Sequence, residues 1–198
     1  MKLKEGGLLI QLARKAIEAV IKGQDIRDIK ETSEFEKKRG VFVSIYIEKK
    51  LRGCVGIPYP IMPLGKAVIE AAQAAAFEDP RFPPVSEEEF RNIRIEISVL
   101  THPAMIETEE ARKREDILRD IEVGRDGLIV KHSGFTGLLL PQVAVEQRWN
   151  AQKFLEQTCI KAGISPKDWK GKDCKIYKFQ AQIFSETKPN GKIAEKKL

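Results

Sequence analysis

Long apolar runs and aromatic side chains are both scarce in this sequence of 198 residues. No stretch approaches the roughly 18 consecutive apolar residues that a membrane-spanning helix needs, so no membrane partner is expected. The first residues, MKLKEGG, lack the apolar core of a signal peptide, which predicts a cytoplasmic location. Aromatic residues make up only 7% of the chain, and no strand pattern combines basic and aromatic side chains as RNA-reading sheets do.

Cysteine and histidine are also few, which limits the kinds of disulfide, metal site and catalytic site that the chain could form. Cys54, Cys159 and Cys174 are an odd number without CxxC pairing, and this favours free thiols in a reducing compartment. Neither the cysteines nor His102 and His132 have the spacing of metal ligands. We therefore predict no metal and no cofactor.

The fractions of apolar and charged residues are typical of one globular domain, or of one domain with a smaller lobe. Apolar residues are 42% and charged residues 32%, enough of each for a sizeable core and a charged surface. The abundance of Lys, Glu and Arg fits a heat-adapted, thermostable protein. Part of the net charge of +6 lies in residues 188–198, which we expect to be a basic, flexible tail that contributes little to folding.

The order of helix and strand patterns predicts the fold class. Apolar spacing predicts a helix over residues 3–22, with Leu8, Leu12, Ala16 and Val20 on its buried face. Alternating patterns predict a hairpin over residues 41–57 and strands over residues 93–100 and 175–184. Further helices are expected after Pro63, after Ser86 and between Asn150 and Gly163, turns at residues 124–127 and 132–137, and a solvated loop or helix at 109–116. This order predicts an α+β fold with an antiparallel or mixed sheet flanked by helices.

One helix start is marked with particular clarity. In VSEEEF, Ser86 and Glu89 have the spacing of a capping box, in which each side chain bonds to the backbone amide of the other. Val85 and Phe90 stand at the two positions of a hydrophobic staple.

The hexapeptide LRGCVG, residues 51–56, raises the main functional question. In a regular strand Arg52, Cys54 and Gly56 share one face, while Gly53 lies on the other. Burial of an unpaired guanidinium is costly, so the Cys54 face is predicted to be a cleft or rim. The exceptions would be an acid that pairs with Arg52 or a bulge at Gly53.

Two readings of Cys54 stay open. It is either a packing or binding residue, as free cysteines commonly are, or a reactive thiol whose ionisation Arg52 favours. Gly53 and Gly56 would then let a ligand approach the backbone. A nucleophilic cysteine needs a base, and His132 and Glu146 are the candidates.

Two further stretches carry candidate binding residues. Asp79 and Arg81 flank Pro80, either as a local ion pair at a helix end or as the rim of a site for an anionic ligand. In LLLPQVAVEQRWN, Trp149 is either a core residue or a binding residue, and Glu146 could pair with Arg52.

LRGCVG, DPRF and LPQVAVEQRW, in this order and spacing, resemble the AMMECR domain family over about residues 5–185. The usual family hexapeptide, LRGCIG, appears here with Val55. The resemblance implies a single AMMECR-type α+β domain over residues 1–187 with a larger lobe, a smaller lobe around 115–141 and a cleft between them. It also implies a shared surface formed by Arg52, Gly53, Cys54, Gly56, Asp79, Arg81, Glu146 and Trp149.

The resemblance implies no established reaction. Some related chains carry the domain fused to Memo-type and radical-SAM domains, which suggests such proteins as partners. We therefore expect a site for an unknown small-molecule or protein partner around LRGCVG, either in a cysteine-dependent enzyme or in a binding protein. In such an enzyme Cys54 would be the nucleophile or redox thiol, Arg52 its anion anchor, and Glu146 or His132 the proton carrier. The alternative is an RNA-binding module that uses Arg52, Arg81 and the lysine-rich tail.

Overall fold

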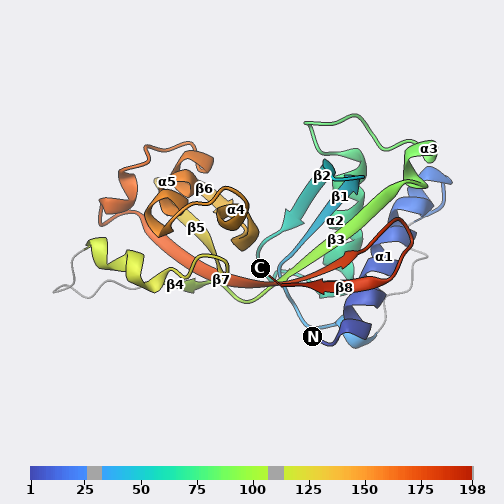
Figure 1. Cartoon of the computed structure of the whole chain (residues 1–198), viewed down its shortest axis with the longest axis horizontal. Coiled ribbons are helices and arrows are strands. Elements are labelled where there is room, and N and C mark those ends of the chain that lie inside the picture. Colours follow the sequence, from blue (N-terminus) through green and yellow to red (C-terminus); the bar gives the residue numbers. More distant parts are fainter. Residues whose placement is uncertain (26–32, 107–113, 198) are drawn as a thin grey trace. The chain divides into compact units, whose positions relative to one another are not determined.

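The computed structural model describes residues 1–25, 33–106 and 114–197 (Figure 1). The chain forms two compact units. Unit 1 holds residues 1–100 and 182–197, and unit 2 holds residues 101–181. Unit 2 is therefore wider than the small lobe expected around residues 115–141. The solvated segment expected at residues 109–116 lies mostly outside the described residues.

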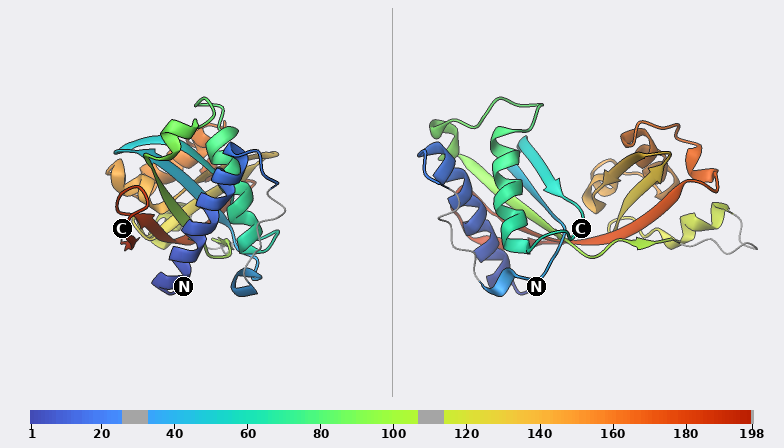
Figure 2. Two further views of the ribbon diagram at one scale, coloured as in Figure 1. Left: turned by 90° about the vertical axis from the view of Figure 1, so that its right-hand side faces the viewer. Right: turned by 180° about the vertical axis from the view of Figure 1, so that it is seen from behind.

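Unit 1 is a layer of antiparallel strands covered on one face by two helices, α1 and α2 (Figure 2). Strand β2 is at one edge and pairs with β1, which pairs with β3. The elements are α1 (Leu3–Ile21), η2 (Ser33–Phe35), β1 (Val41–Ile47), β2 (Lys50–Ile57), α2 (Leu64–Phe77), α3 (Glu87–Phe90), β3 (Ile93–Leu100), the end of β7 (Lys175–Glu186) and β8 (Ile193–Lys196). This arrangement confirms the predicted α+β fold class, while the cleft between lobes stays a prediction.

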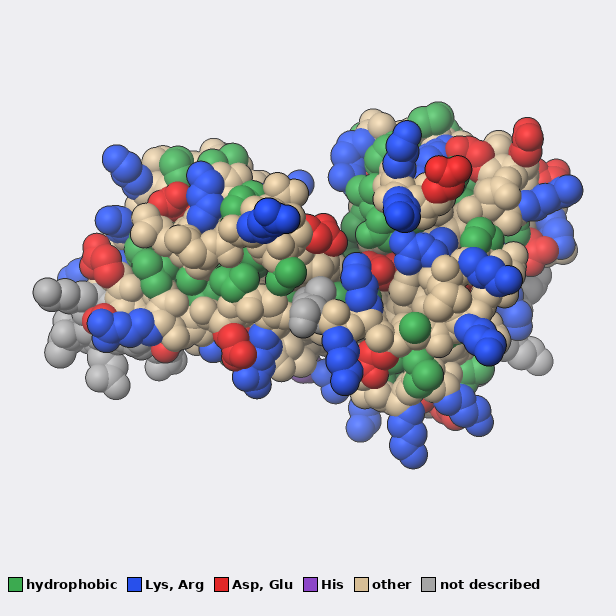
Figure 3. Space-filling model, in the orientation of Figure 1, with side chains coloured by type: hydrophobic (Ala, Val, Ile, Leu, Met, Phe, Trp, Pro, Cys, Tyr) green, Lys and Arg blue, Asp and Glu red, His purple; other side chains and the backbone are tan. Residues whose placement is uncertain are grey.

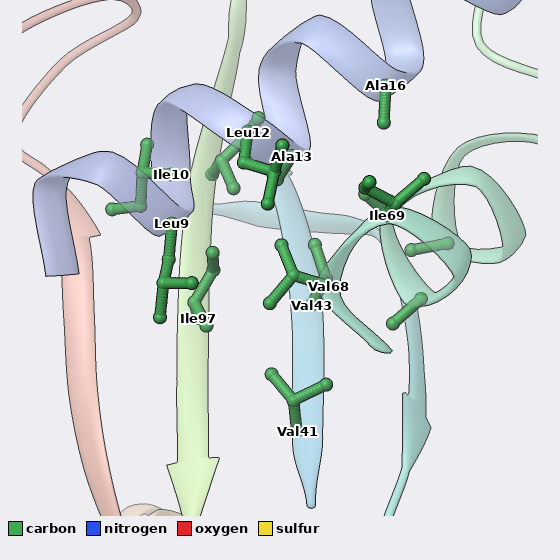
Figure 4. Packing of buried hydrophobic residues seen from close by; sticks show 14 of the residues in the cluster. Leu9, Ile10, Leu12, Ala13, Ala16, Val41, Val43, Val68, Ile69 and Ile97 are labelled. Atoms are coloured by element: carbon green, nitrogen blue, oxygen red, sulfur yellow. The ribbon is translucent and has the colours of Figure 1, made fainter. Parts of the chain in front are cut away.

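The core of unit 1 lies between the two helices and one face of the strands. Figure 4 shows Leu9 and Leu12 of α1 and Val68 of α2 against Val43 and Ile97. The helix pattern of the sequence was partly wrong: Val20 is 38% exposed, and Leu9, Ala13 and Ile17 complete the buried stripe instead. The alternation of β1 and β3 was predicted correctly, because Val41, Val43, Ile45, Ile93, Ile95 and Ile97 are all fully buried.

Unit 2 is a smaller antiparallel sheet with its own helices and its own core. Strand β5 pairs with β6 on one side and with β7 on the other, and β4 also pairs with β7. Its elements are β4 (Ala104–Met105), η3 (Arg114–Asp120), β5 (Asp126–His132), β6 (Phe135–Leu139), α4 (Pro141–Glu146), α5 (Ala151–Lys161), η4 (Asp168–Lys170) and the start of β7. Asn150 caps α5 through a 2.8 Å bond from the Lys153 amide, as predicted.

The C-terminal residues differ from the expectation of a flexible tail. Residues 193–196 form β8, which pairs antiparallel with the end of β7. Ile193 packs against the core of unit 1, and the Lys196 ammonium lies 3.7 Å from a carboxylate oxygen of Glu96. The prediction of a flexible tail was wrong for these residues. The four lysines of residues 188–198 are typical of a solvated segment, but the edge of β7 pairs with a short strand within it.

Across the part of the chain that the structure describes, no helix combines the length and the apolar character needed to cross a membrane.

Candidate functional site around Cys54

Cys54 lies near the middle of β2, the edge strand of unit 1, and its thiol is half-buried. Its backbone N–H donates to Oδ2 of Asp79 at 2.9 Å, and its carbonyl accepts from Nη2 of Arg81 at 3.3 Å. Because these backbone groups are directed away from β1, Cys54 and its partner Ser44 form a non-hydrogen-bonded cross-strand pair, the kind in which side chains approach most closely.

The thiol belongs to a row of three polar side chains that crosses three strands. Ser44 on β1 is opposite Cys54 on β2 and Glu96 on β3, so the three side chains share one face of the sheet. The Ser44 hydroxyl donates to the Cys54 sulfur, with 3.2 Å between Oγ and Sγ. This face is opposite the one that packs against α1 and α2.

Glu96 is the most unusual member of this row. Its carboxylate is 2% exposed, and Oε1 has no hydrogen-bond partner among the described residues. The ammonium group of Lys196 on β8 lies 3.7 Å from Oε2. A buried carboxylate oxygen without a donor is costly, so this position suits the donor group of a ligand.

Asp79 and Arg81 form a tight ion pair that fixes the backbone of Cys54. The Arg81 guanidinium donates to both carboxylate oxygens of Asp79, at 2.9 and 2.7 Å. Hydrogen bonding by this guanidinium holds the pKa of Asp79 well below its ordinary value and raises the pKa of Arg81. The Asp79 side chain is 3% exposed and that of Arg81 is 54% exposed, so the arginine remains at the surface.

The thiol is neutral in this environment. Burial raises the pKa of Cys54, and the Asp79 and Glu96 carboxylates raise it further. The hydrogen bond from Ser44 and the charge of Arg81 oppose this rise without overcoming it. The expectation of a thiol acidified by Arg52 was therefore wrong.

Arg52 is paired with an acid, as one of the two exceptions allowed, and the strand has a bulge, although at Arg52 rather than at Gly53. The register between β1 and β2 shifts so that Arg52 is the extra residue of a bulge, between the pairs Ile45–Gly53 and Tyr46–Leu51. Its guanidinium is paired with Glu89, at 2.8 and 2.9 Å, rather than with Glu146. Glu89 also forms the predicted capping box with Ser86, so one carboxylate serves both the α3 cap and Arg52.

The glycines of LRGCVG allow close packing, because neither position has room for a Cβ atom. A Cβ on Gly53 would lie 2.0 Å from the carbonyl oxygen of Ala75, which shows how closely α2 approaches β2. A Cβ on Gly56 would lie 2.3 Å from the Phe42 ring. Close approach of the protein's own groups thus accounts for both residues, and their role toward a ligand stays a prediction.

The structure brings together Cys54, Asp79 and Arg81, with Arg52, Gly53 and Gly56 on the same strand as Cys54. The other candidates, His132, Glu146 and Trp149, are in unit 2. His132 ends β5, and its Nδ1 is buried without a hydrogen-bond partner among the described residues. Glu146 is exposed at the end of α4, and Trp149 packs against the core of unit 2. Their roles as base or binding residues stay predictions.

Sequence reasoning missed Ser44 and Glu96 as neighbours of Cys54, and it predicted the cap formed by Glu89 but not its pairing with Arg52. Ser44 and Glu96 are polar residues at alternate positions in otherwise apolar strands, which was the available signal. Among the described residues, no cluster of three or more His, Cys, Asp or Glu side chains could hold a metal ion.

The sequence and the fold are those of a known class of proteins. The family model described as AMMECR1 matches residues 10–184, and this chain belongs to that family, as its resemblance suggested. Protein MJ0810 of Methanocaldococcus jannaschii is 45% identical over 200 residues, which covers 100% of this chain and 98% of that protein. Protein MK0488 of Methanopyrus kandleri is 45% identical over 202 residues, covering 100% and 96%.

A solved structure of a relative has the same fold. The crystal structure of the uncharacterized protein PH0010 from Pyrococcus horikoshii matches with a TM-score of 0.92 at 46% sequence identity. The match covers 100% of this chain and 99% of the other.

Proposed function

We propose that this protein binds a small molecule beside Cys54 and acts on it as a thiol-dependent enzyme. The observation that supports this most directly is the 3.2 Å contact between the Ser44 hydroxyl and the Cys54 sulfur, next to the buried carboxylate of Glu96. A neutral thiol needs a proton acceptor before it can attack, and the row supplies one.

The row suggests how the proton moves. As Cys54 Sγ forms a bond with an electrophilic carbon of the ligand, its proton passes through the Ser44 hydroxyl to Glu96. The group that leaves that carbon then takes the proton from Glu96, which restores the carboxylate. In this scheme Glu96 takes the role that the sequence assigned to Glu146 or His132.

In this proposal Asp79 and Arg81 position the thiol rather than transfer its proton. By holding both backbone groups of Cys54, they fix the position of the thiol relative to Ser44. The exposed end of Arg81 remains at the rim, where it suits an anionic group of a ligand.

The test uses iodoacetamide as a small electrophile on the native protein at neutral pH, with Cys54→Ala as the control that removes the target. If Glu96 accepts the thiol proton, Glu96→Gln should slow the labelling of Cys54 severalfold. If Glu96 acts only through its charge, the same substitution should lower the Cys54 pKa and accelerate labelling, because that carboxylate raises the pKa. Acceleration would contradict the proposal.

RNA binding has less support. Arg52 and Arg81 are both paired with carboxylates, which reduces their attraction for phosphate. On the face drawn in Figure 3, Lys and Arg side chains are scattered among Asp and Glu rather than gathered in one stripe. Binding to a generic RNA that weakens steeply with salt and survives Cys54→Ala would favour this alternative. The association with Memo-type and radical-SAM proteins stays a prediction.

A further inference from the structure

The C-terminal strand β8 places a cation on the same face of the unit 1 sheet as Cys54. Lys196 of β8 is directly opposite Ile183 of β7, and β7 lies between β8 and β3, the strand of Glu96 (Figure 1). The Lys196 side chain therefore passes over the buried Ile183 and brings its ammonium within 3.7 Å of Glu96 Oε2.

Contacts that do not involve the Lys196 side chain fix the position of β8. In the turn that precedes the strand, the Thr187 amide donates to the Lys192 carbonyl at 2.9 Å. Ile193, on the opposite face of β8 from Lys196, packs against the core of unit 1. Because the turn and this packing set the register of β8, Lys196 is directed towards the face that carries Glu96.

Glu96 needs this cation because its charge is buried. Its side chain is 2% exposed, and Lys196 forms its only ion pair among the described residues. Arg94, on the same face of β3, has other partners: its Nη1 donates to the Ser185 hydroxyl at 2.7 Å, and its guanidinium lies 4.7 Å from the centre of the Tyr46 ring. A buried carboxylate that lost its cation would take up a proton or turn to solvent. In either case it would cease to be the proton acceptor of the row.

Lys196 is too distant to act on the Cys54 thiol directly. Strands β1, β3 and β7 lie between β2 and β8, so the strands of the two residues are four spacings apart, about 19 Å along the sheet. Charges separated by more than about 8 Å are largely screened at physiological ionic strength unless they are buried. An effect of Lys196 on Cys54 is therefore expected to pass through Glu96.

We infer that Lys196 is a positioning residue of the site around Cys54, which keeps Glu96 ionised and in place as the acceptor of the thiol proton. The row of polar side chains thus extends from β2 to β8, and the site is complete only while β8 is docked on β7. This inference rests on the proposed function, because Lys196 has this role only if Glu96 accepts that proton.

The test compares rates of Cys54 labelling by iodoacetamide at neutral pH, measured by mass spectrometry. Lys196→Gln should slow labelling severalfold, to the rate of Glu96→Gln, and Lys196→Arg, which keeps the charge, should label close to the wild-type rate. Lys196→Met keeps an apolar stem over Ile183 without the charge, so it should slow labelling as much as Lys196→Gln does. Lys197→Gln removes the same charge from the exposed neighbouring residue and should label at the wild-type rate.

A double variant shows whether Lys196 acts through Glu96. If it does, the chain with both Lys196→Gln and Glu96→Gln should label at the rate of Glu96→Gln alone. A wild-type rate in Lys196→Met, no recovery in Lys196→Arg, equal slowing by Lys197→Gln, or a double variant slower than Glu96→Gln would each overturn the inference. The proposed function would stand in these cases as long as Glu96→Gln itself slows labelling. Acceleration by Glu96→Gln would contradict the proposed function, and this inference with it.

Discussion

Asp79 is the residue on which the geometry of LRGCVG depends most. Its two carboxylate oxygens accept from the amides of Cys54 and Arg81 and twice from the Arg81 guanidinium. A carboxylate that accepts four hydrogen bonds in a buried position cannot be replaced by an amide, which accepts with only one atom. The removal of Asp79 should therefore affect β2 as well as Arg81.

The first prediction concerns Asp79→Asn. At pH 7 the substitution should lower the free energy of unfolding by about 2 kcal/mol, the usual effect of losing hydrogen bonds to a charged group. The folded-state pKa of Asp79 is depressed, so its stabilisation is present above the unfolded pKa of about 3.9 and is lost as the pH falls below it. Urea unfolding at pH 7, 4 and 3 should show a difference between the wild type and the variant that shrinks with falling pH. The exposed Asp173, changed to Asn, is the matched control and should leave stability unchanged.

The second prediction concerns the pH dependence of the Cys54 thiol. Because its pKa is raised, the rate of alkylation should keep rising above pH 8.5, about where an ordinary cysteine is half ionised. Ser44→Ala removes a hydrogen bond that lowers this pKa and should slow alkylation at every pH below the plateau. Mass spectrometry of the alkylated peptides measures both rates, with the buried Cys159 as the internal reference. A plateau reached below pH 8 would contradict the raised pKa.

At the scale of elements, the strands could be predicted from the sequence but their register could not. Alternation located β1, β2 and β3, and it separated the core face from the other face. Counting back from the turn in a regular hairpin would place Ser44 opposite Gly53. The bulge at Arg52 shifts the pairing by one residue and places Ser44 opposite Cys54 instead. The sequence suggested a bulge at Gly53 but not its position at Arg52, whose guanidinium is paired with Glu89, 37 residues along the chain.

The third prediction concerns the contact between β2 and α2. In Gly53→Ala the new methyl group would meet the backbone carbonyl of Ala75, which cannot rotate away. Either α2 or β2 must shift, which should cost about 3 kcal/mol and lower the melting temperature by about 6 °C or more. Gly7→Ala in α1 is the control: its Cβ would make an ordinary 3.7 Å contact with Ile193 and should stabilise the helix by about 0.5–1 kcal/mol. Equal melting temperatures for the two variants would show that the close approach carries no cost.

The fourth prediction concerns β8. Deletion of residues 188–198 should lower the melting temperature by several degrees, because it removes the strand partner of β7, the packing of Ile193 and the cation beside Glu96. A shorter deletion that begins after Lys196 retains all three features and should have little effect. Thermal unfolding followed by circular dichroism compares the two chains. An unchanged melting temperature after the longer deletion would mean that β8 does not dock on the core.

At the scale of the whole molecule, the sequence predicted the fold class but not the division of the chain. Strand β7 reads as one uninterrupted strand, yet residues up to Ala181 belong to unit 2 and residues from Gln182 belong to unit 1. The buried side chains change accordingly along the strand, from Ile176 and Phe179 to Ile183 and Phe184. The single alternating pattern that predicted a strand over residues 175–184 could not indicate this change.

The fifth prediction concerns the independence of unit 1. Among the described residues, its core contains no side chain from residues 101–181. The chain leaves and re-enters at neighbouring points, since the Thr101 amide donates to the Gln180 carbonyl at 2.9 Å and the Gln180 amide donates to the Thr101 hydroxyl at 2.8 Å. A chain in which a short turn replaces residues 101–181 should therefore fold and unfold cooperatively. A molten chain, without a cooperative transition in urea, would show that unit 2 is needed for folding.

The side chains that hold Cys54 also determine how β2 meets other molecules. An edge strand presents unpaired amides and carbonyls, which can recruit a strand from another chain and begin aggregation. At Cys54 both of these groups are already occupied, one by the carboxylate of Asp79 and the other by the guanidinium of Arg81. An incoming strand would have to displace the ion pair of Asp79 and Arg81 before it could bond there. The ion pair thus disfavours edge-to-edge polymerisation at this position of β2.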